Sequence, residues 1–138
     1  THYAEDLLRL ARMYGNAWVA IEANNHGHAV CHWLYSHLKY RRLFKESKEI
    51  QGDYGTRSVA RLGLLTTAAS KPGMLAAVEV GLRGQTISVR DDALADELST
   101  YLCLPGGDYG AAPGSHDDRL MALCLAQVAR QKPLPRAF

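Results

Sequence analysis

The sequence predicts an α/β domain. Two segments with helical spacing of apolar residues flank a short, mostly apolar run at residues 17–23, which is rich in strand-forming side chains. Because that run does not alternate between polar and apolar residues, both faces of the strand must be covered, as in a parallel sheet. Helix, buried strand and helix in succession are typical of α/β proteins. The 138 residues, of which 47% are hydrophobic and 22% charged, suffice for one domain spanning 1–138.

The first half of the chain supplies these elements in order. Apolar residues recur at three- and four-residue spacing over 2–14, and Gly15 follows as a helix stop. The strand at 17–23 comes next, and a second amphipathic helix is predicted over 26–38. The basic stretch after it contains two glycines and several aromatic residues, which indicates an exposed loop or a hairpin.

The second half continues the alternation of strand and helix. Residues 63–67 can form a short strand. Ser70 is placed as an N-cap, Pro72 lies in the first turn, and a glycine follows the last turn, so a helix is predicted over 70–83. Residues 85–89 alternate and are short enough for another strand.

Two more helices are predicted near the end of the chain. The first covers 93–102, and a glycine-rich segment at 105–114 follows it. Ser115 and Asp118, three residues apart, form a near-capping box before a long apolar helical pattern.

The net charge of +2 conceals an asymmetry along the chain. Residues 39–61 contain seven bases and three acids, whereas 91–118 contain seven acids and neither Lys nor Arg. A basic segment suggests a surface for a polyanion, and an acidic one is either a solvated face or a place where cations bind.

Other composition signals exclude several classes of protein. The three cysteines are odd in number and far apart, which indicates neither a disulfide framework nor a thiolate zinc site and favours a reducing, cytosolic setting. No uncharged apolar run approaches the roughly 20 residues of a membrane-spanning helix, so we expect no membrane partner.

Three carboxylates are the strongest candidates for chemistry. Glu22 interrupts the apolar strand near its carboxyl end, so it must reach solvent, meet a base or hold a cation. Asp117 and Asp118 lie in the first turn of the last helix, where the helix dipole alone can explain them. Brought together, the three would repel unless divalent cations screened them, and such hard oxygen ligands favour Mg²⁺ or Mn²⁺.

Four motifs follow one another along most of the chain. Residues 19–27 read Val-Ala-Ile-Glu-Ala-Asn-Asn-His-Gly, in the pattern of apolar residues, Glu, x, Asn, Asn, x and Gly. Three further segments follow in order: a Thr-rich turn with Lys-Pro (67–72), an acid-Glu-Leu helix (96–98) and a Gly-x-His-Asp-Asp element (114–122). In these motifs and their order, the sequence resembles the nuclease domain of tailed-phage large terminase subunits. The resemblance implies a ribonuclease H-like fold, a mixed sheet flanked by helices, that cuts double-stranded DNA with bound Mg²⁺ or Mn²⁺.

The resemblance also implies roles for the acids. Glu22 matches the family's second acidic residue, and Asp117 or Asp118 matches the last. Helical spacing does not separate the two aspartates, so both remain candidates as metal ligands in two-metal phosphodiester hydrolysis. The family's first catalytic aspartate lies on a strand upstream of the opening helix, whereas this sequence starts at that helix. We therefore expect an N-terminally truncated sheet, with an exposed edge that favours dimerisation.

Basic residues are the candidates for DNA contacts. They are Lys71, Arg41, Arg42, Arg57 and Arg61. Such residues can follow the phosphates of a duplex without reading its sequence, although a solvated charged loop explains them equally well. His116 adjoins the acid pair, where it could contact a phosphate or metal-bound water, or could cap the helix.

The predicted function is therefore metal-dependent endonuclease activity on concatemeric double-stranded DNA in the host cytoplasm. The implied partners are the terminase ATPase domain, the portal and the small terminase subunit. Two alternatives stay open. One is a non-catalytic fragment that binds DNA or docks on the portal or small subunit, because the first aspartate is missing. The other is a different ribonuclease H-like enzyme, such as a junction resolvase.

Overall fold

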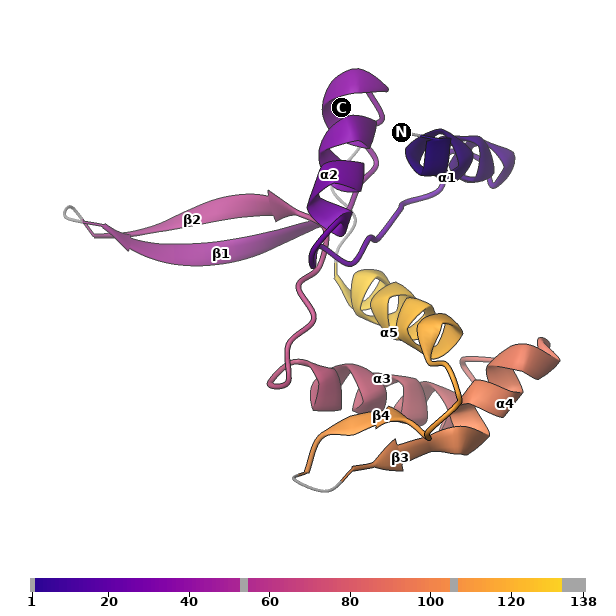
Figure 1. Cartoon of the computed structure of the whole chain (residues 1–138). Helices are drawn as coiled ribbons and strands as arrows, with labels where there is room; N and C mark the ends of the chain where they lie inside the picture. Colours follow the sequence, from indigo (N-terminus) through magenta and orange to yellow (C-terminus); the bar gives the residue numbers. More distant parts are fainter. Residues whose placement is uncertain (1, 53–54, 105–106, 133–138) are drawn as a thin grey trace. The chain divides into compact units, whose positions relative to one another are not determined.

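The computed structural model describes residues 2–52, 55–104 and 107–132, which form a mixed α/β structure (Figure 1). In these ranges, five α-helices and one π-helical turn accompany two antiparallel sheets of two strands each. None of the described helices is long and apolar enough to cross a membrane. The chain divides into two compact units, unit 1 (Thr1–Thr66) and unit 2 (Thr67–Phe138), and each is described by itself. The prediction of one domain over 1–138 stays a prediction.

Helices form the larger part of the core of unit 1. Helix α1 (His2–Met13) buries Ala4, Leu8 and Ala11, as the spacing predicts. Helix α2 (Gly27–His32) continues as the π-helical turn η1 (Trp33–His37), in which the N–H of Leu38 donates to the carbonyl of Trp33 at 3.0 Å. Both predicted helices are confirmed, but nothing in the residue pattern indicates the π-helical turn. Leu34 and Leu43 complete the buried cluster together with Tyr40.

The apolar run at 17–23 is extended but is not a full strand. Val19 and Leu43 form one isolated parallel bridge, and Glu22 and Leu64 form another. The N–H of Leu64 donates to the carbonyl of Ile21 at 2.9 Å. The parallel direction is the one predicted, yet among the described residues such pairing occurs only as single bridges. The second predicted strand, at 63–67, is likewise reduced to bridges at its first two residues.

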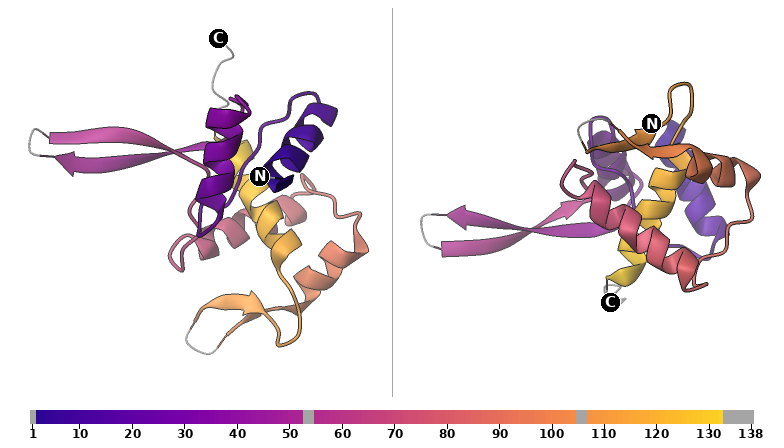
Figure 2. Two further views of the ribbon diagram at one scale, coloured as in Figure 1. Left: turned by 45° about the horizontal axis from the view of Figure 1, so that its top comes forward. Right: turned by 90° about the horizontal axis from the view of Figure 1, so that it is seen from below.

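The basic stretch forms a hairpin. Strands β1 (Lys45–Gly52) and β2 (Gly55–Leu62) pair antiparallel along their whole length, from Lys45 with Leu62 to Gly52 with Gly55. The hairpin extends away from α2 in every view (Figures 1 and 2). Most of its described side chains are exposed. A two-stranded hairpin with little packing is only marginally stable in water, so this element is suited to contact another molecule.

Unit 2 consists of three helices and a short hairpin. Its elements are α3 (Lys71–Arg83), α4 (Asp92–Thr100), β3 (Tyr101–Cys103), β4 (Tyr109–Ala111) and α5 (Asp118–Gln131). Helix α5 packs against α3 and α4. Val78 on α3 and Leu120, Cys124 and Leu125 on α5 are buried. The predicted helices are confirmed, although α4 ends at Thr100 because the following residues pair with β4.

The strand predicted at 85–89 is wrong. Gln85 has a φ of +55°, which turns the chain back at the end of α3. The N–H groups of Thr86 and Ile87 then both donate to the carbonyl of Gly81, at 2.9 and 3.1 Å. A Cβ at Gly81 would lie 2.4 Å from Cδ1 of Ile87, so the apolar side chain of Ile87 covers a glycine rather than joining a sheet.

Gly27 provides a test of the packing around Glu22. A Cβ at Gly27 would lie 1.7 Å from the backbone oxygen of Glu22, so Gly27→Ala must displace this segment. We expect a loss of unfolding free energy of about 1–3 kcal/mol or more, measured by urea denaturation. Gly73→Ala is the matched control, since no described residue lies within 4 Å of the Cβ that it adds and alanine favours the helix. Equal stability of the two variants would contradict the close approach.

Candidate functional site

In unit 1, an asparagine holds the side chain of Glu22. Glu22 is half-buried beside the parallel bridge to Leu64, and its Oε1 accepts a hydrogen bond from Nδ2 of Asn24 at 3.2 Å. Asn24 is itself tied to the backbone of Thr66. Its Nδ2 donates to the Thr66 carbonyl at 2.7 Å, and its Oδ1 accepts from the Thr66 N–H at 3.2 Å. Asn24 therefore orients the carboxylate relative to two extended segments.

Within the described part of the chain, no base forms an ion pair with Glu22. In contrast, Glu46, Glu79 and Glu97 each pair with an arginine. Desolvating a carboxylate without a cation is costly, so a half-buried, oriented and unpaired glutamate is suited to receive one. The residue pattern identifies Glu22 as a candidate but not the role of Asn24, for which the Glu-x-Asn spacing is the only sequence signal.

In unit 2, the two candidate aspartates begin the last helix. Asp118 is exposed and is the first residue of α5, while Asp117 is half-buried at the N-cap position. Asp117 makes no side-chain capping bond. The predicted box between Ser115 and Asp118 is therefore wrong, because Asp117 and not Ser115 occupies the N-cap. His116 is exposed and lines a small hollow of about 250 Å³ beside Glu97.

Glu97 from α4 caps α5 instead. It is 6% exposed, and its Oε2 accepts from the N–H of Leu120 at 2.9 Å. Its Oε1 accepts from Nη1 of Arg119 at 3.2 Å, and Arg119 also pairs with Asp91. Burial alone raises the pKa of Glu97, but the hydrogen bonds from Leu120 and Arg119 outweigh it and hold the pKa below its ordinary value.

The position of Glu97 within α4 is a sequence signal for its capping role. Glu97 falls four residues after Ala93 and three after Leu94, so helical spacing places it on the same side as these apolar residues. Both are partly buried in the structure. An acid on the apolar side of a helix needs a partner inside the fold, and the start of α5 provides it.

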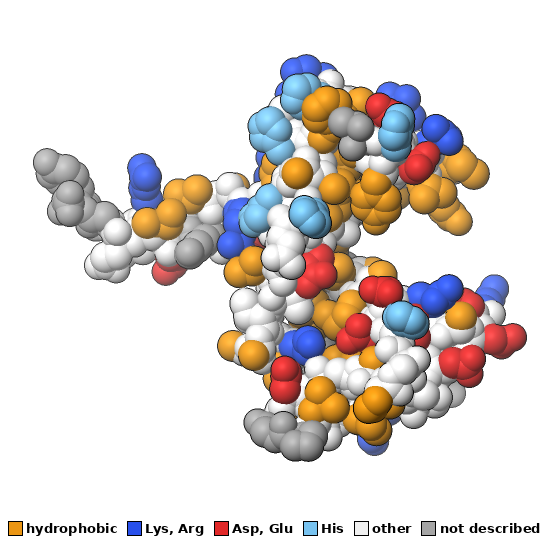
Figure 3. Space-filling model, in the orientation of Figure 1, with side chains coloured by type: hydrophobic (Ala, Val, Ile, Leu, Met, Phe, Trp, Pro, Cys, Tyr) orange, Lys and Arg blue, Asp and Glu red, His pale blue; other side chains and the backbone are white. Residues whose placement is uncertain are grey.

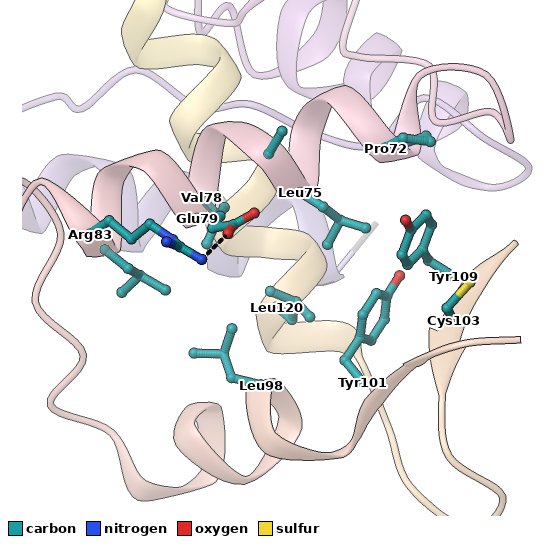
Figure 4. Close-up of a pocket in the computed structure, with 12 residues that line it drawn as sticks. Pro72, Leu75, Val78, Glu79, Arg83, Leu98, Tyr101, Cys103, Tyr109 and Leu120 are labelled. Carbon is teal, nitrogen blue, oxygen red and sulfur yellow. Dashed lines mark ion pairs between the residues drawn. The ribbon is translucent and has the colours of Figure 1, made fainter. Parts of the chain in front are cut away.

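A groove in unit 2 lies between α3 and the β3–β4 hairpin (Figure 4). Its volume is about 650 Å³, and Leu75, Leu98 and Leu120 give it apolar walls. The hydroxyl of Tyr101 is buried and has no hydrogen-bond partner among the described residues. Burial, with a smaller contribution from Asp117, raises the pKa of Tyr101 to about 12. The groove can therefore receive an apolar group, and Tyr101 remains a protonated donor at neutral pH.

Aromatic rings hold two of the candidate DNA-binding arginines. The guanidinium of Arg41 lies 4.0 Å from the ring centroid of Tyr35, and that of Arg42 lies 5.7 Å from the ring of Trp18. Nζ of Lys45 donates to the Tyr35 hydroxyl at 3.4 Å. This bond, together with the charges of Lys45 and Arg41, lowers the pKa of Tyr35. Both arginines are exposed, so a phosphate could meet them in a partly fixed position.

The other three candidate bases differ in their surroundings. Arg57 is exposed on β2, opposite Ile50. Arg61 forms a cross-strand ion pair with Glu46, which compensates its charge. Lys71 donates to the backbone oxygen of Tyr109 at 3.1 Å, so part of its donor capacity is used inside unit 2.

The candidate metal ligands are distributed over both units. Glu22 belongs to unit 1, and Asp117 and Asp118 belong to unit 2. Within either unit, the described residues form no group of three or more His, Cys, Asp or Glu side chains that could hold an ion. The donor chemistry nevertheless fits Mg²⁺ or Mn²⁺, because all three are carboxylates and none has an ion-pair partner among the described residues.

Comparison of the sequence with models of known protein families and with curated proteins finds no match.

The capping role of Glu97 predicts a pH-dependent contribution to stability. Glu97→Gln loses the charge facing Arg119, so the variant unfolds at lower temperature than the wild type at pH 7. Since the folded pKa is lowered, this difference is complete above the ordinary glutamate pKa of about 4.3 and disappears as the pH falls through the lowered value. Thermal unfolding monitored by circular dichroism between pH 2 and 7 measures it, with Glu79→Gln, an exposed helical pair, as control. A difference independent of pH would contradict the assignment.

Proposed function

We propose that this chain is the nuclease domain of a phage DNA-packaging terminase, with a ribonuclease H-like fold, and that it hydrolyses double-stranded DNA. The observation that carries the proposal is the carboxylate of Glu22. It stands beside a parallel bridge, is oriented by Asn24, and has no basic partner among the described residues. In open α/β sheets, the carboxyl ends of parallel strands are where ligands bind.

In this proposal, Glu22, Asp117 and Asp118 hold Mg²⁺ or Mn²⁺. Bound ions of this kind activate water and stabilise the leaving oxygen of a phosphodiester. Asn24 orients Glu22, and Glu97 fixes the start of α5, where Asp117 and Asp118 are the N-cap and the first residue. His116 is next to them in the chain and exposed, so it is free to meet a phosphate.

Duplex DNA is the substrate class that fits the basic residues. Arg41 and Arg42 are exposed and supported by aromatic rings, and Arg57 lies on a two-stranded ribbon, an element narrow enough to enter a DNA major groove. Arg61 and Lys71 take part in internal contacts and contribute less in this account. The terminase ATPase domain, portal and small subunit are the proposed partners, in the cytoplasm of the host.

A second candidate function is non-catalytic binding. The ring-supported arginines and the hairpin can bind a polyanion without any metal. In that case the chain retards duplex DNA in a gel, salt weakens the complex, and no nicks form with Mn²⁺. A preference for four-way junctions over linear duplex would instead indicate a junction resolvase.

Plasmid nicking in the presence of Mn²⁺ tests the nuclease proposal. We expect Glu22→Gln to abolish nicking, because the variant lacks a carboxylate ligand. Asn24→Ala should reduce the rate by about 10–100-fold, the usual effect of removing a group that orients a ligand. Asp117→Asn and Asp118→Asn, tested separately, identify the aspartate that matters. Glu5→Gln on α1 is the control and should nick normally. A variant that combines Asp117→Asn and Asp118→Asn completes the set, and nicking that survives both this double variant and Glu22→Gln would overturn the proposal.

A further inference from the structure

Helix α1 carries an apolar stripe that its own unit leaves uncovered. Tyr3, Leu10 and Tyr14 are 63%, 50% and 78% exposed, and Leu7 lies between them, partly buried against the core of unit 1. Tyr14 continues the helix, because its N–H donates to the carbonyl of Leu10 at 3.1 Å. Figure 3 shows hydrophobic side chains gathered along this helix. Single exposed apolar residues are common, but a stripe of them marks an interaction surface.

The stripe is separate from the face that α1 buries. Around the helix axis, successive residues are 100° apart. The mean direction of the exposed stripe therefore lies roughly a quarter turn from that of the buried stripe, which consists of Ala4, Leu8 and Ala11. One side of the helix thus completes the core of unit 1, while a second apolar side remains without a partner in that unit.

The order of residues in the stripe is mirror-symmetric. Tyr, Leu, Leu and Tyr follow one another at spacings of four, three and four residues, so the stripe reads the same from either end. An interface between two identical copies must be self-complementary, and a mirror-symmetric stripe meets this condition when the helices run antiparallel. We propose that α1 docks antiparallel on α1 of a second copy of this chain, with Tyr3 against Tyr14 and Leu7 against Leu10.

Charged residues also lie beside the stripe. Asp6 and Arg9 form an exposed ion pair at 3.4 Å within each copy. In the antiparallel register, Arg9 of the second copy comes level with a point about 1.5 Å along the axis from Arg9 and about 3 Å from Asp6. These charges therefore do not select the second copy, and the apolar stripe alone carries the proposal. The proposal does not depend on the nuclease function.

The small size of the stripe makes this a weak dimer. A helix of 12 residues is about 18 Å long, and four side chains from each copy cover less than the roughly 800 Å² per partner of a standard interface. We expect association in the micromolar to millimolar range, which the cell would reach only where copies of the chain are held close together.

Sedimentation equilibrium tests the proposal with the whole chain. The average mass should rise toward that of a dimer as the concentration increases to about 1 mM. Leu10→Glu and Tyr14→Lys should remain monomeric, while Val80→Glu, at a 70% exposed apolar residue on α3, should associate as the wild type does. The hydrogen bond from Tyr14 to Leu10 is made by the backbone N–H, which Tyr14→Lys keeps, so this variant preserves the end of the helix. A wild type that is monomeric at every concentration would overturn the proposal.

Cross-linking tests the antiparallel register, in a Cys103→Ser background because Cys103 is exposed. Two copies of Leu10→Cys would lie about 5 Å apart along the axis, and two copies of Tyr14→Cys about 16 Å apart, with the axes 8–10 Å from each other. A bismaleimide spanning roughly 10 Å should therefore join the first variant into dimers and leave the second monomeric. Efficient cross-linking of both variants, as parallel helices would give, or of neither, would contradict the proposal.

Discussion

The contact between Asn24 and Thr66 is the interaction on which the candidate site depends. One amide side chain bonds both backbone groups of Thr66 and also the carboxylate of Glu22. It thereby adds to the isolated parallel bridge between Glu22 and Leu64, which joins the same two segments. Gly27 allows the next helix to start against the Glu22 carbonyl, where any side chain would collide. The spacing of Glu22, Asn24 and Gly27 in the sequence therefore has a direct physical reason.

Glu22 and Glu97 show how surroundings give two similar side chains different roles. Glu97 is buried, accepts hydrogen bonds from Arg119 and Leu120, and has a lowered pKa, so its charge is used in holding α5 to α4. Glu22 is half-buried. Among the described residues, its carboxylate is hydrogen-bonded to the neutral amide of Asn24 and to no base, so its charge remains available to a cation. The acidic character of residues 91–118 therefore serves partly to build the fold.

The helices and the mixed α/β class were predictable, as was a loop or hairpin at the basic stretch, because periodic apolar spacing and turn residues act locally. The strand at 85–89 was not, since the contact of Ile87 with Gly81 is a tertiary one that alternation does not reveal. The sequence predicts that Ser115 caps α5. The side chain that accepts the capping hydrogen bond is Glu97, which lies on another helix and is not evident from the local sequence. The residue pattern identifies Glu22, Asp117 and Asp118 as candidate ligands, but it gives no contacts for any of them. The hydrogen bonds of Asn24 and the ion pair of Arg61 join residues far apart in the sequence, so only the folded structure reveals them.

The proposed nuclease function requires that Glu22 and at least one of Asp117 and Asp118 bind the same ions. Titration of Mn²⁺ followed by electron paramagnetic resonance, on the wild type, Glu22→Gln, Asp118→Asn and the double variant, tests it most directly. If the side chains share a site, each single variant weakens Mn²⁺ binding and the two losses are strongly non-additive. Unchanged affinity in the single variants, or losses that simply add, would contradict the account.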